Sequence, residues 1–151
     1  MKIAEALIER ADIQKRISQL SVRLQNNALV QDGENPAENP SELLAELDRL
    51  VRRLCELVAQ INLTNAKTEV DGMSVTEMLS LRDALSQKAE ILRNFLNVAS
   101  SKSMRNRGSE IVIKSTVSVS EIQKNVDGIS KQLREIDTKI QGINWTTDLI
   151  E

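Results

Sequence analysis

The feature that most constrains this fold is a spacing of apolar residues. In four long stretches they recur at alternating steps of three and four. An α-helix has 3.6 residues per turn, so this spacing places them on one side of a helix. It predicts four long amphipathic helices with coiled-coil-like repeats, over about residues 3–28, 40–65 and 75–99, and from Ser118 or Ser120 to about residue 143. We therefore expect a mostly α protein, an antiparallel four-helix bundle forming a single domain over residues 1–151.

The ends of the predicted helices carry recognisable start and stop signals. Residues 31–40 contain glycine and two prolines, which no regular helix accommodates. Asn39 before Pro40 is typical of a helix start, because the Asn side chain caps the helix and Pro suits its first position. Asp71-Gly72 indicates a turn, and Ser74 with Glu77 forms a capping box.

Between the third and fourth helices the apolar period changes from helical to two. Residues 111–119 alternate apolar and more polar side chains, the pattern of a strand with one buried face. A lone strand leaves its backbone unpaired and therefore needs a partner. We expect a short β-strand or hairpin here. The possible partners are a bend at Ser115-Thr116, residues 29–31, residues 68–70 or another subunit.

Composition excludes several classes of site. The chain has no histidine, which removes Ser-His and Cys-His nucleophiles and histidine metal sites. Its single cysteine, Cys55, has no second cysteine for a disulfide or a zinc site, and we expect a buried small hydrophobic side chain. One Phe, one Trp and a net charge of −2 give no reason to expect a nucleic-acid partner. We predict no catalytic, cofactor-binding or metal-binding residues.

No targeting or membrane-spanning segment is predicted. Glu5 and Glu9 interrupt the first apolar residues, and apolar runs never exceed three residues. A spanning helix needs about 20 mostly apolar residues. A single cysteine fits a reducing compartment. We therefore expect a cytoplasmic protein.

Two arginines, Arg10 and Arg82, occupy helix positions where the spacing predicts an apolar residue. A charge there must be paired, reach solvent along its own stem, or bind an anion or ligand. Asp12 lies two residues from Arg10, and Asp83 lies next to Arg82. Side chains one or two residues apart on a helix point in different directions, which favours pairing of these arginines across helices. These four residues are the candidates for a buried ion pair or ligand site.

Two further features are candidates for partner contact. Lys102, Arg105 and Arg107 make a short basic patch, either a solvated connector or a contact for an anion or partner. Trp145 leaves the apolar repeat of the last helix. It is expected either to cap the end of the bundle or to anchor a second subunit.

Several segments together resemble a known family. They are Arg10-Ala11-Asp12, Asn27-Ala28-Leu29-Val30-Gln31-Asp32-Gly33-Glu34 with Pro36 and Pro40, Thr64-Asn65, Arg82-Asp83, and Arg134-Glu135-Ile136-Asp137 before Asn144-Trp145-Thr146-Thr147. The chain resembles, over nearly its whole length, the septicolysin-like family of small, largely uncharacterised bacterial helical proteins. The family name implies a membrane-active cytolysin. The resemblance implies no catalytic or binding residues.

The leading functional hypothesis is an interaction or scaffold protein that forms a homo-oligomer. Wide apolar helix faces and few aromatic residues favour contacts between helices, and the predicted strand needs a partner. One alternative is the membrane-active cytolysin that the family name implies. The other is an enzyme or ligand binder that uses arginine and carboxylate groups between helices.

Overall fold

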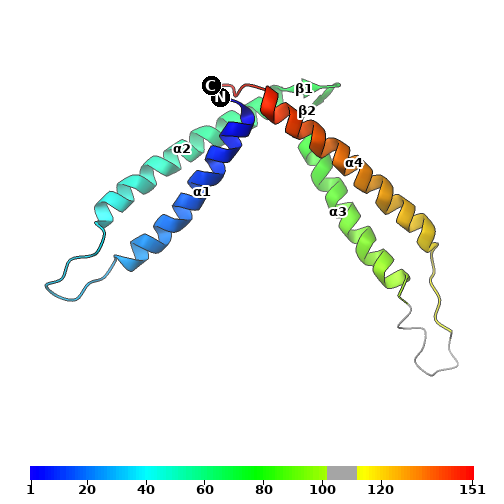
Figure 1. The fold of residues 1–151 in the computed structure, drawn as a ribbon, viewed down its shortest axis with the longest axis horizontal. Helices are drawn as coiled ribbons and strands as arrows, with labels where there is room; N and C mark the ends of the chain where they lie inside the picture. Colours follow the sequence, from blue (N-terminus) through cyan, green and yellow to red (C-terminus); the bar gives the residue numbers. More distant parts are fainter. Residues whose placement is uncertain (102–111) are drawn as a thin grey trace. The chain divides into compact units, whose positions relative to one another are not determined.

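The computed structural model describes residues 1–101 and 112–151 of the chain (Figure 1). It contains the helices α1 (Ile3–Asn26), α2 (Pro40–Lys67), α3 (Val75–Ala99) and α4 (Val119–Thr146). Two short strands, β1 (Glu69–Val70) and β2 (Met73–Ser74), lie between α2 and α3. The predicted mostly α fold with four long helices is confirmed.

The described residues form two compact units. One comprises Met1–Ser74 with Gly142–Glu151, and the other comprises Val75–Gln141. The first contains the antiparallel pair α1 and α2, and the second contains α3 with most of α4. The expectation of a single domain stays a prediction, and each unit is described by itself.

The core of the first unit lies between α1 and α2. It is built from the predicted apolar stripes of both helices, with Ala6, Ile13 and Leu20 facing Leu43, Leu50, Leu57 and Ile61. Leu20 and Leu57 are fully buried. Burying a side chain of this size stabilises the fold by about 1.5–3 kcal/mol. The three-and-four spacing therefore accounts for this pairing of helices.

The start of α2 follows the predicted capping signal. Asn39 Oδ1 accepts a hydrogen bond from the Ser41 backbone N–H at 3.0 Å, and Pro40 is the first helical residue. Asn39 thereby satisfies a backbone donor that has no partner within the helix. In the preceding loop, Glu34 N–H donates to Gln31 O at 3.0 Å, closing a turn in which Gly33 has φ +84°.

Strand pairing occurs at Asp71-Gly72. Glu69 pairs with Ser74 and Val70 with Met73, in antiparallel register. Asp71 and Gly72 have φ values of 55° and 78°. Two successive positive φ angles are the hallmark of the type I′ turn that matches the twist of a two-residue hairpin. The predicted turn is confirmed, and it carries the β-hairpin.

The prediction of a strand over residues 111–119 is wrong for the part of this segment that the structure describes. Residues 112–118 form no strand and α4 begins at Val119, while Ile111 lies outside the described residues. Ser115 Oγ donates to Val117 O at 3.0 Å and accepts from Val117 N–H at 3.4 Å. These local bonds bend the backbone in place of a ladder. Ile113 lies on the face expected to be buried and is 49% exposed, so the alternation does not bury that face.

In the second unit α3 and α4 run antiparallel. Val75, Met78 and Ala89 of α3 are buried, as are Val126, Ile129 and Ile140 of α4. Arg93 Nη2 donates to Ser130 Oγ at 3.1 Å across the pair. Ser118 Oγ accepts a hydrogen bond from Glu121 N–H at 3.4 Å, which confirms the predicted helix start.

Candidate functional site

The outer edges of the α1–α2 pair are joined by arginine–carboxylate contacts. Arg53 Nε and Nη2 donate to the two carboxylate oxygens of Glu9 at 2.7 and 2.9 Å. Arg16 Nη2 donates to Glu46 Oε1 at 3.0 Å. The bidentate hydrogen bonds from Arg53 hold the pKa of Glu9 below its ordinary value of 4.5. These partly exposed contacts set the register of the two helices.

The Glu9 pair gives a pH-dependent prediction. A lowered carboxylate pKa contributes stability that is present above the ordinary value of 4.5 and lost as the pH falls through the folded value. Glu9→Gln should therefore be less stable than the wild type at pH 7, by at most about 1 kcal/mol for a pair this exposed. The difference should shrink as the pH falls from 4.5 through the folded pKa of Glu9. Urea unfolding at pH 7 and over a series of pH values below 4.5 measures it, with Asp12→Asn as the control. A difference that stays constant over the whole series would contradict this account.

Arg23 holds the loop after α1 in place through hydrogen bonds to Glu38. Arg23 donates three hydrogen bonds to the Glu38 carboxylate, at 2.6 to 3.2 Å. Asn27 is buried and interrupts the apolar stripe of α1. Its Nδ2 donates to Arg23 O at 2.8 Å, and its Oδ1 accepts from Glu38 N–H at 2.9 Å. The buried amide is therefore satisfied by the last turn of α1 and by the loop, and its role is structural.

The two ends of the chain are joined to each other and to α2. Ile3 N–H donates to Thr147 O at 3.1 Å, Leu149 N–H donates to Met1 O at 2.8 Å, and Lys2 Nζ lies 2.8 Å from Asp148 Oδ1. Leu149 also packs against the α1–α2 core. Lys2 lowers the pKa of Asp148 by hydrogen bonding to it. We call residues 1–3 with 147–150 the terminal clasp.

Thr64 of α2 anchors the terminal clasp. The fully buried Thr64 Oγ1 donates to Gln60 O at 2.7 Å and accepts from Ile150 N–H at 2.9 Å. Thr64→Val keeps the volume but leaves Ile150 N–H without this acceptor. We expect a loss of about 1–3 kcal/mol in unfolding free energy and faster amide exchange at Ile150. Exchange mass spectrometry measures the second effect, and unchanged exchange at residues 147–151 would refute it.

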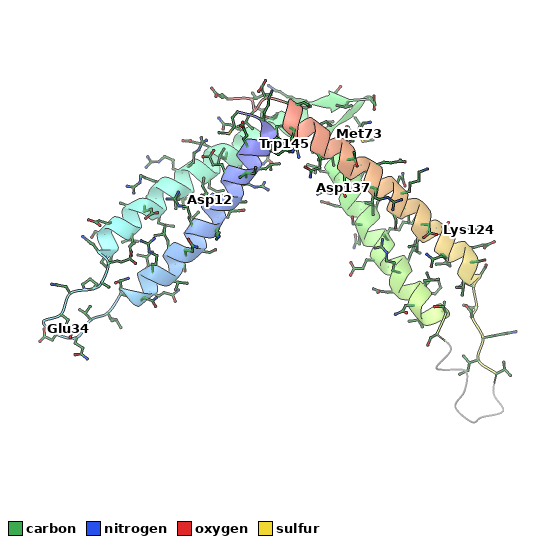
Figure 2. The ribbon with its side chains drawn as sticks, in the orientation of Figure 1. Asp12, Glu34, Met73, Lys124, Asp137 and Trp145 are labelled. Carbon is green, nitrogen blue, oxygen red and sulfur yellow. The ribbon has the colours of Figure 1, made fainter. Side chains whose placement is uncertain are left out.

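Arg10 and Asp12 are not brought together. Arg10 is half-buried on α1. Its Nε is buried and finds no hydrogen-bond acceptor among residues 1–101 and 112–151. Asp12 is exposed, and Figure 2 places it on α1. Over the same described ranges no ion pair joins the two, as expected for side chains two residues apart on a helix, and none joins Arg10 to another helix. The cross-helix pairing that was favoured for Arg10 is therefore not found among these residues.

Arg82 contacts a carboxylate on its own helix, which the helix-geometry argument disfavoured, and one on α4, which is the kind of cross-helix contact that the argument favoured. Arg82 Nε and Nη2 lie 3.2 and 3.1 Å from Asp83 Oδ1, and Nη1 lies 3.9 Å from Asp137 Oδ1 of α4. The long arginine stem bends along α3 and reaches its own neighbour. The Arg82 side chain is about a third exposed and Asp83 is largely exposed, so the pair is not buried. Two carboxylates already surround this guanidinium, which disfavours an anion site.

Of the remaining residues singled out in the sequence, the structure describes Cys55 and Trp145. Cys55 is exposed rather than buried, because α1 covers only one side of the wide apolar face of α2. Trp145 near the end of α4 is 58% exposed, so it is not a buried cap and its partner-contact role stays a prediction (Figure 2). Lys102, Arg105 and Arg107 lie outside the described residues.

Over residues 1–101 and 112–151, no group of three or more acidic or cysteine side chains is arranged to hold a metal ion. Within the same ranges no helix is both long enough and apolar enough to cross a membrane.

The most distinctive surface is a second apolar stripe on α3, turned away from the residues that pack on α4. Leu81, Ile91, Phe95 and Val98 are exposed, with exposed fractions of 36, 60, 42 and 68%. Ala84 and Lys88 are exposed at the intervening positions. The complete set, Leu81, Ala84, Lys88, Ile91, Phe95 and Val98, repeats in steps of three and four. We call it the outer stripe of α3.

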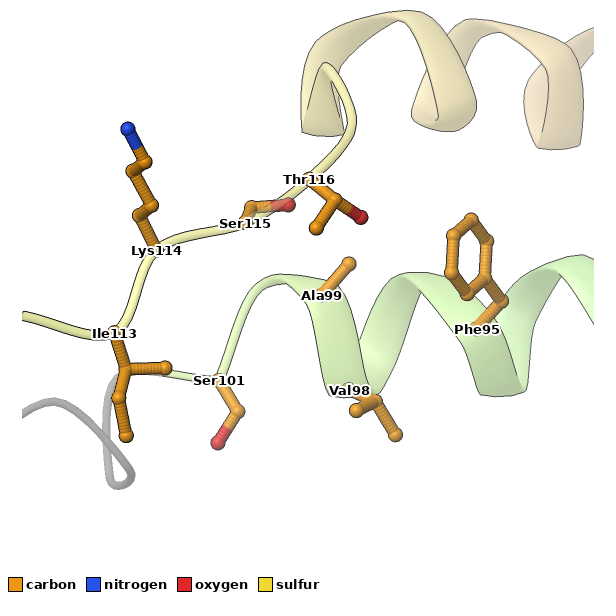
Figure 3. A pocket seen from close by; sticks show the side chains of 8 residues that line it. All are labelled: Phe95, Val98, Ala99, Ser101, Ile113, Lys114, Ser115 and Thr116. Carbon is orange, nitrogen blue, oxygen red and sulfur yellow. The ribbon is translucent and has the colours of Figure 1, made fainter.

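The outer stripe of α3 continues into the segment before α4. Phe95, Val98 and Ala99 line a hollow of about 220 Å³ together with Ile113 and Thr116 (Figure 3). The Ile113 side chain is half exposed. The apolar surface therefore extends beyond the helix at the Val98 end.

These features define a helical protein that exposes an extended apolar stripe on α3, and in which Arg16, Arg23 and Arg53 make structural contacts with carboxylates. The chain belongs to a family described as a family of unknown function (DUF6847), whose sequence pattern matches residues 10–149. It is similar to a functionally unknown conserved protein from Corynebacterium diphtheriae, known from a crystal structure. The two share 41% identity over 99% of each chain, with a TM-score of 0.91. No curated protein matches the chain. The septicolysin-like resemblance stays a prediction.

Proposed function

We propose that the protein is a self-associating interaction protein, and that a second copy covers the outer stripe of α3. The observation that carries this proposal is the stripe itself, an exposed apolar surface with the spacing of a helix-pairing seam. Large exposed apolar side chains scattered singly need no explanation. A regular repeat of apolar side chains along one helix face differs from scattered ones, because the apolar face of a second helix can pack against it.

The charges around the outer stripe favour a second copy. The positions that flank it on one side are Ser80, Gln87 and Asn94, and all three are uncharged. On its other side lie the half-buried Leu85, Leu92 and Ala99. Charged residues are depleted at the centres of protein interfaces. Lys88 is the one charge within the stripe, so two copies of this surface meet with little like-charge repulsion.

The same flanks disfavour a lipid surface. Helices that lie on membranes carry lysine and arginine on the polar side and aromatic anchors beside the apolar one. Around the outer stripe the flanking positions are neutral, and Phe95 is its single aromatic residue. The stripe therefore fits a protein partner better than an anionic bilayer.

The exposed area suffices for a small interface. The exposed fractions of the four large apolar residues of the stripe correspond to roughly 400 Å² per copy, at the size where apolar patches mark binding sites. Two such patches bury about 800 Å², and the flanks and Ile113 raise the total toward the 1,000 Å² or so expected of a specific contact. We therefore expect a dimer of micromolar rather than nanomolar affinity.

Sedimentation velocity from about 1 to 200 μM tests the proposal across this affinity range. The expected result is a mass that rises with concentration from 16.9 kDa toward twice that value. A mass of 16.9 kDa throughout would overturn the proposal. Flotation with anionic liposomes should leave the protein in the unbound fraction, and co-flotation of a monomer would favour the membrane-active alternative.

A further inference from the structure

We infer that two copies pair through α3 in antiparallel orientation, about a two-fold axis that crosses the helix between residues 89 and 90. This inference rests on the proposed self-association and adds its orientation and register. A symmetric dimer uses the same surface on both subunits, so each residue of the stripe must meet a residue of the same stripe. The order of side chains along the stripe then decides which arrangement fits.

Side-chain volume favours the antiparallel arrangement. Phe95 is the largest side chain of the outer stripe and Ala84 is the smallest. With the axis between residues 89 and 90, Phe95 of one copy faces Ala84 of the second copy. In a parallel pair with helices in register, Phe95 would meet Phe95 and Ala84 would meet Ala84. That arrangement gives crowding at one level and a void at the other.

The charge in the stripe favours the same arrangement. A parallel, in-register pair places Lys88 against Lys88 of the second copy, two like charges at a helix seam. In the antiparallel pair Lys88 lies opposite Ile91 instead. Its alkyl stem packs there while its ammonium group reaches solvent past the neutral flank. A polar residue at a seam position commonly fixes the register of paired helices, at some cost in stability.

The overlap of the two stripes sets the register. With the axis between residues 89 and 90, Leu81 faces Val98 of the second copy, and all six stripe positions find a partner. Shifting the helices by one heptad in one direction moves Phe95 opposite Glu77, and a shift in the other direction moves the positions opposite Leu81 and Ala84 past Ala99, the end of the helix. The proposed register also brings the hollow beside Val98 next to Leu81 of the second copy.

Spin-label distances test the orientation and the register separately from self-association. In a Cys55→Ser background, single nitroxide labels are placed at Ser80, Gln87 and Asn94, which are exposed and polar. At a rise of 1.5 Å per residue, the two labels of a dimer are offset along the helix by about 8 Å at position 87, about 14 Å at position 94 and about 28 Å at position 80.

The expected result is the order 87, 94, 80 from the shortest to the longest distance between labels. Equal distances at the three positions would indicate a parallel pair and overturn the inference, although the dimer itself would stand. Absence of dipolar coupling in a protein that sediments as a monomer would overturn the proposed function as well. If flank labels dissociate the dimer, labels at Glu90 and Asn97 replace them, and position 90 must then give the shorter distance.

Discussion

Leu57→Ala is expected to lower the free energy of unfolding by about 2–5 kcal/mol, the largest effect among the substitutions considered. Leu57 is fully buried between α1 and α2 and belongs to the cluster with Ala6 and Leu50. Truncation removes its apolar contacts and leaves a cavity that two long helices cannot easily close. Urea unfolding followed by circular dichroism measures the loss.

Leu63→Ala is the matched control for this substitution. Leu63 lies on the same helix and is 41% exposed, so the same truncation should cost below about 1 kcal/mol. Both variants are compared at one protein concentration, because self-association links stability to concentration. Equal losses for the two variants would mean that the α1–α2 interface is not the main source of stability.

Ile91→Lys is expected to weaken self-association by about 100-fold or more, while the monomer remains folded. Ile91 is 60% exposed on α3, so a lysine there is solvated in the monomer. In the proposed dimer the new ammonium group faces Lys88 of the second copy, and a symmetric interface contains this like-charge contact twice. Sedimentation at about 100 μM should then show a species near 16.9 kDa.

The control for Ile91→Lys is Ile8→Lys. Ile8 is 61% exposed on α1, so it matches Ile91 in residue type and exposure. This variant should keep the mass of the wild-type protein. Dissociation by Ile8→Lys with retention of the dimer by Ile91→Lys would move the interface from α3 to α1.

The sequence predicted the elements whose signals are local or periodic. Three-and-four spacing located all four helices, and the Asn39-Pro40 and Ser118 signals located two of their starts. These signals work because capping and amphipathic burial depend on residues within one helix. The turn at Asp71-Gly72 was likewise predicted, because few residues adopt two successive positive φ angles.

The incorrect predictions have physical causes. Strands of two residues have no period to detect, so the hairpin around Asp71-Gly72 was not expected as paired strands. Residues 112–118 alternate apolar and polar side chains, but the Ser115 hydroxyl bonds to its own neighbourhood and no partner strand is supplied. Cys55 was assigned to the core because the apolar face of α2 is wide, whereas α1 covers one side of it.

The sequence did not predict two features of the candidate site, the terminal clasp and the outer stripe of α3, and the reasons differ. The terminal clasp joins Lys2 to Asp148 and Thr64 to Ile150, pairs far apart in sequence without a shared pattern. The outer stripe of α3 does have a sequence signal, the heptad series Ala84, Ile91 and Val98. The three-and-four spacing predicts only one apolar stripe on this helix, and the exposed fractions are needed to show that a second stripe is uncovered.

The most direct test of the α3 interface is hydroxyl-radical footprinting of the wild-type protein at about 1 μM and 200 μM, concentrations that bracket the expected affinity. If a second copy covers the outer stripe of α3, oxidation of Ile91, Phe95 and Val98 should fall at the higher concentration. Oxidation of Ile8, which is as exposed as Ile91 in the monomer, should be the same at both concentrations. Equal oxidation of Ile91, Phe95 and Val98 at both concentrations, in a sample that sediments as a dimer at the higher one, would contradict this assignment of the interface.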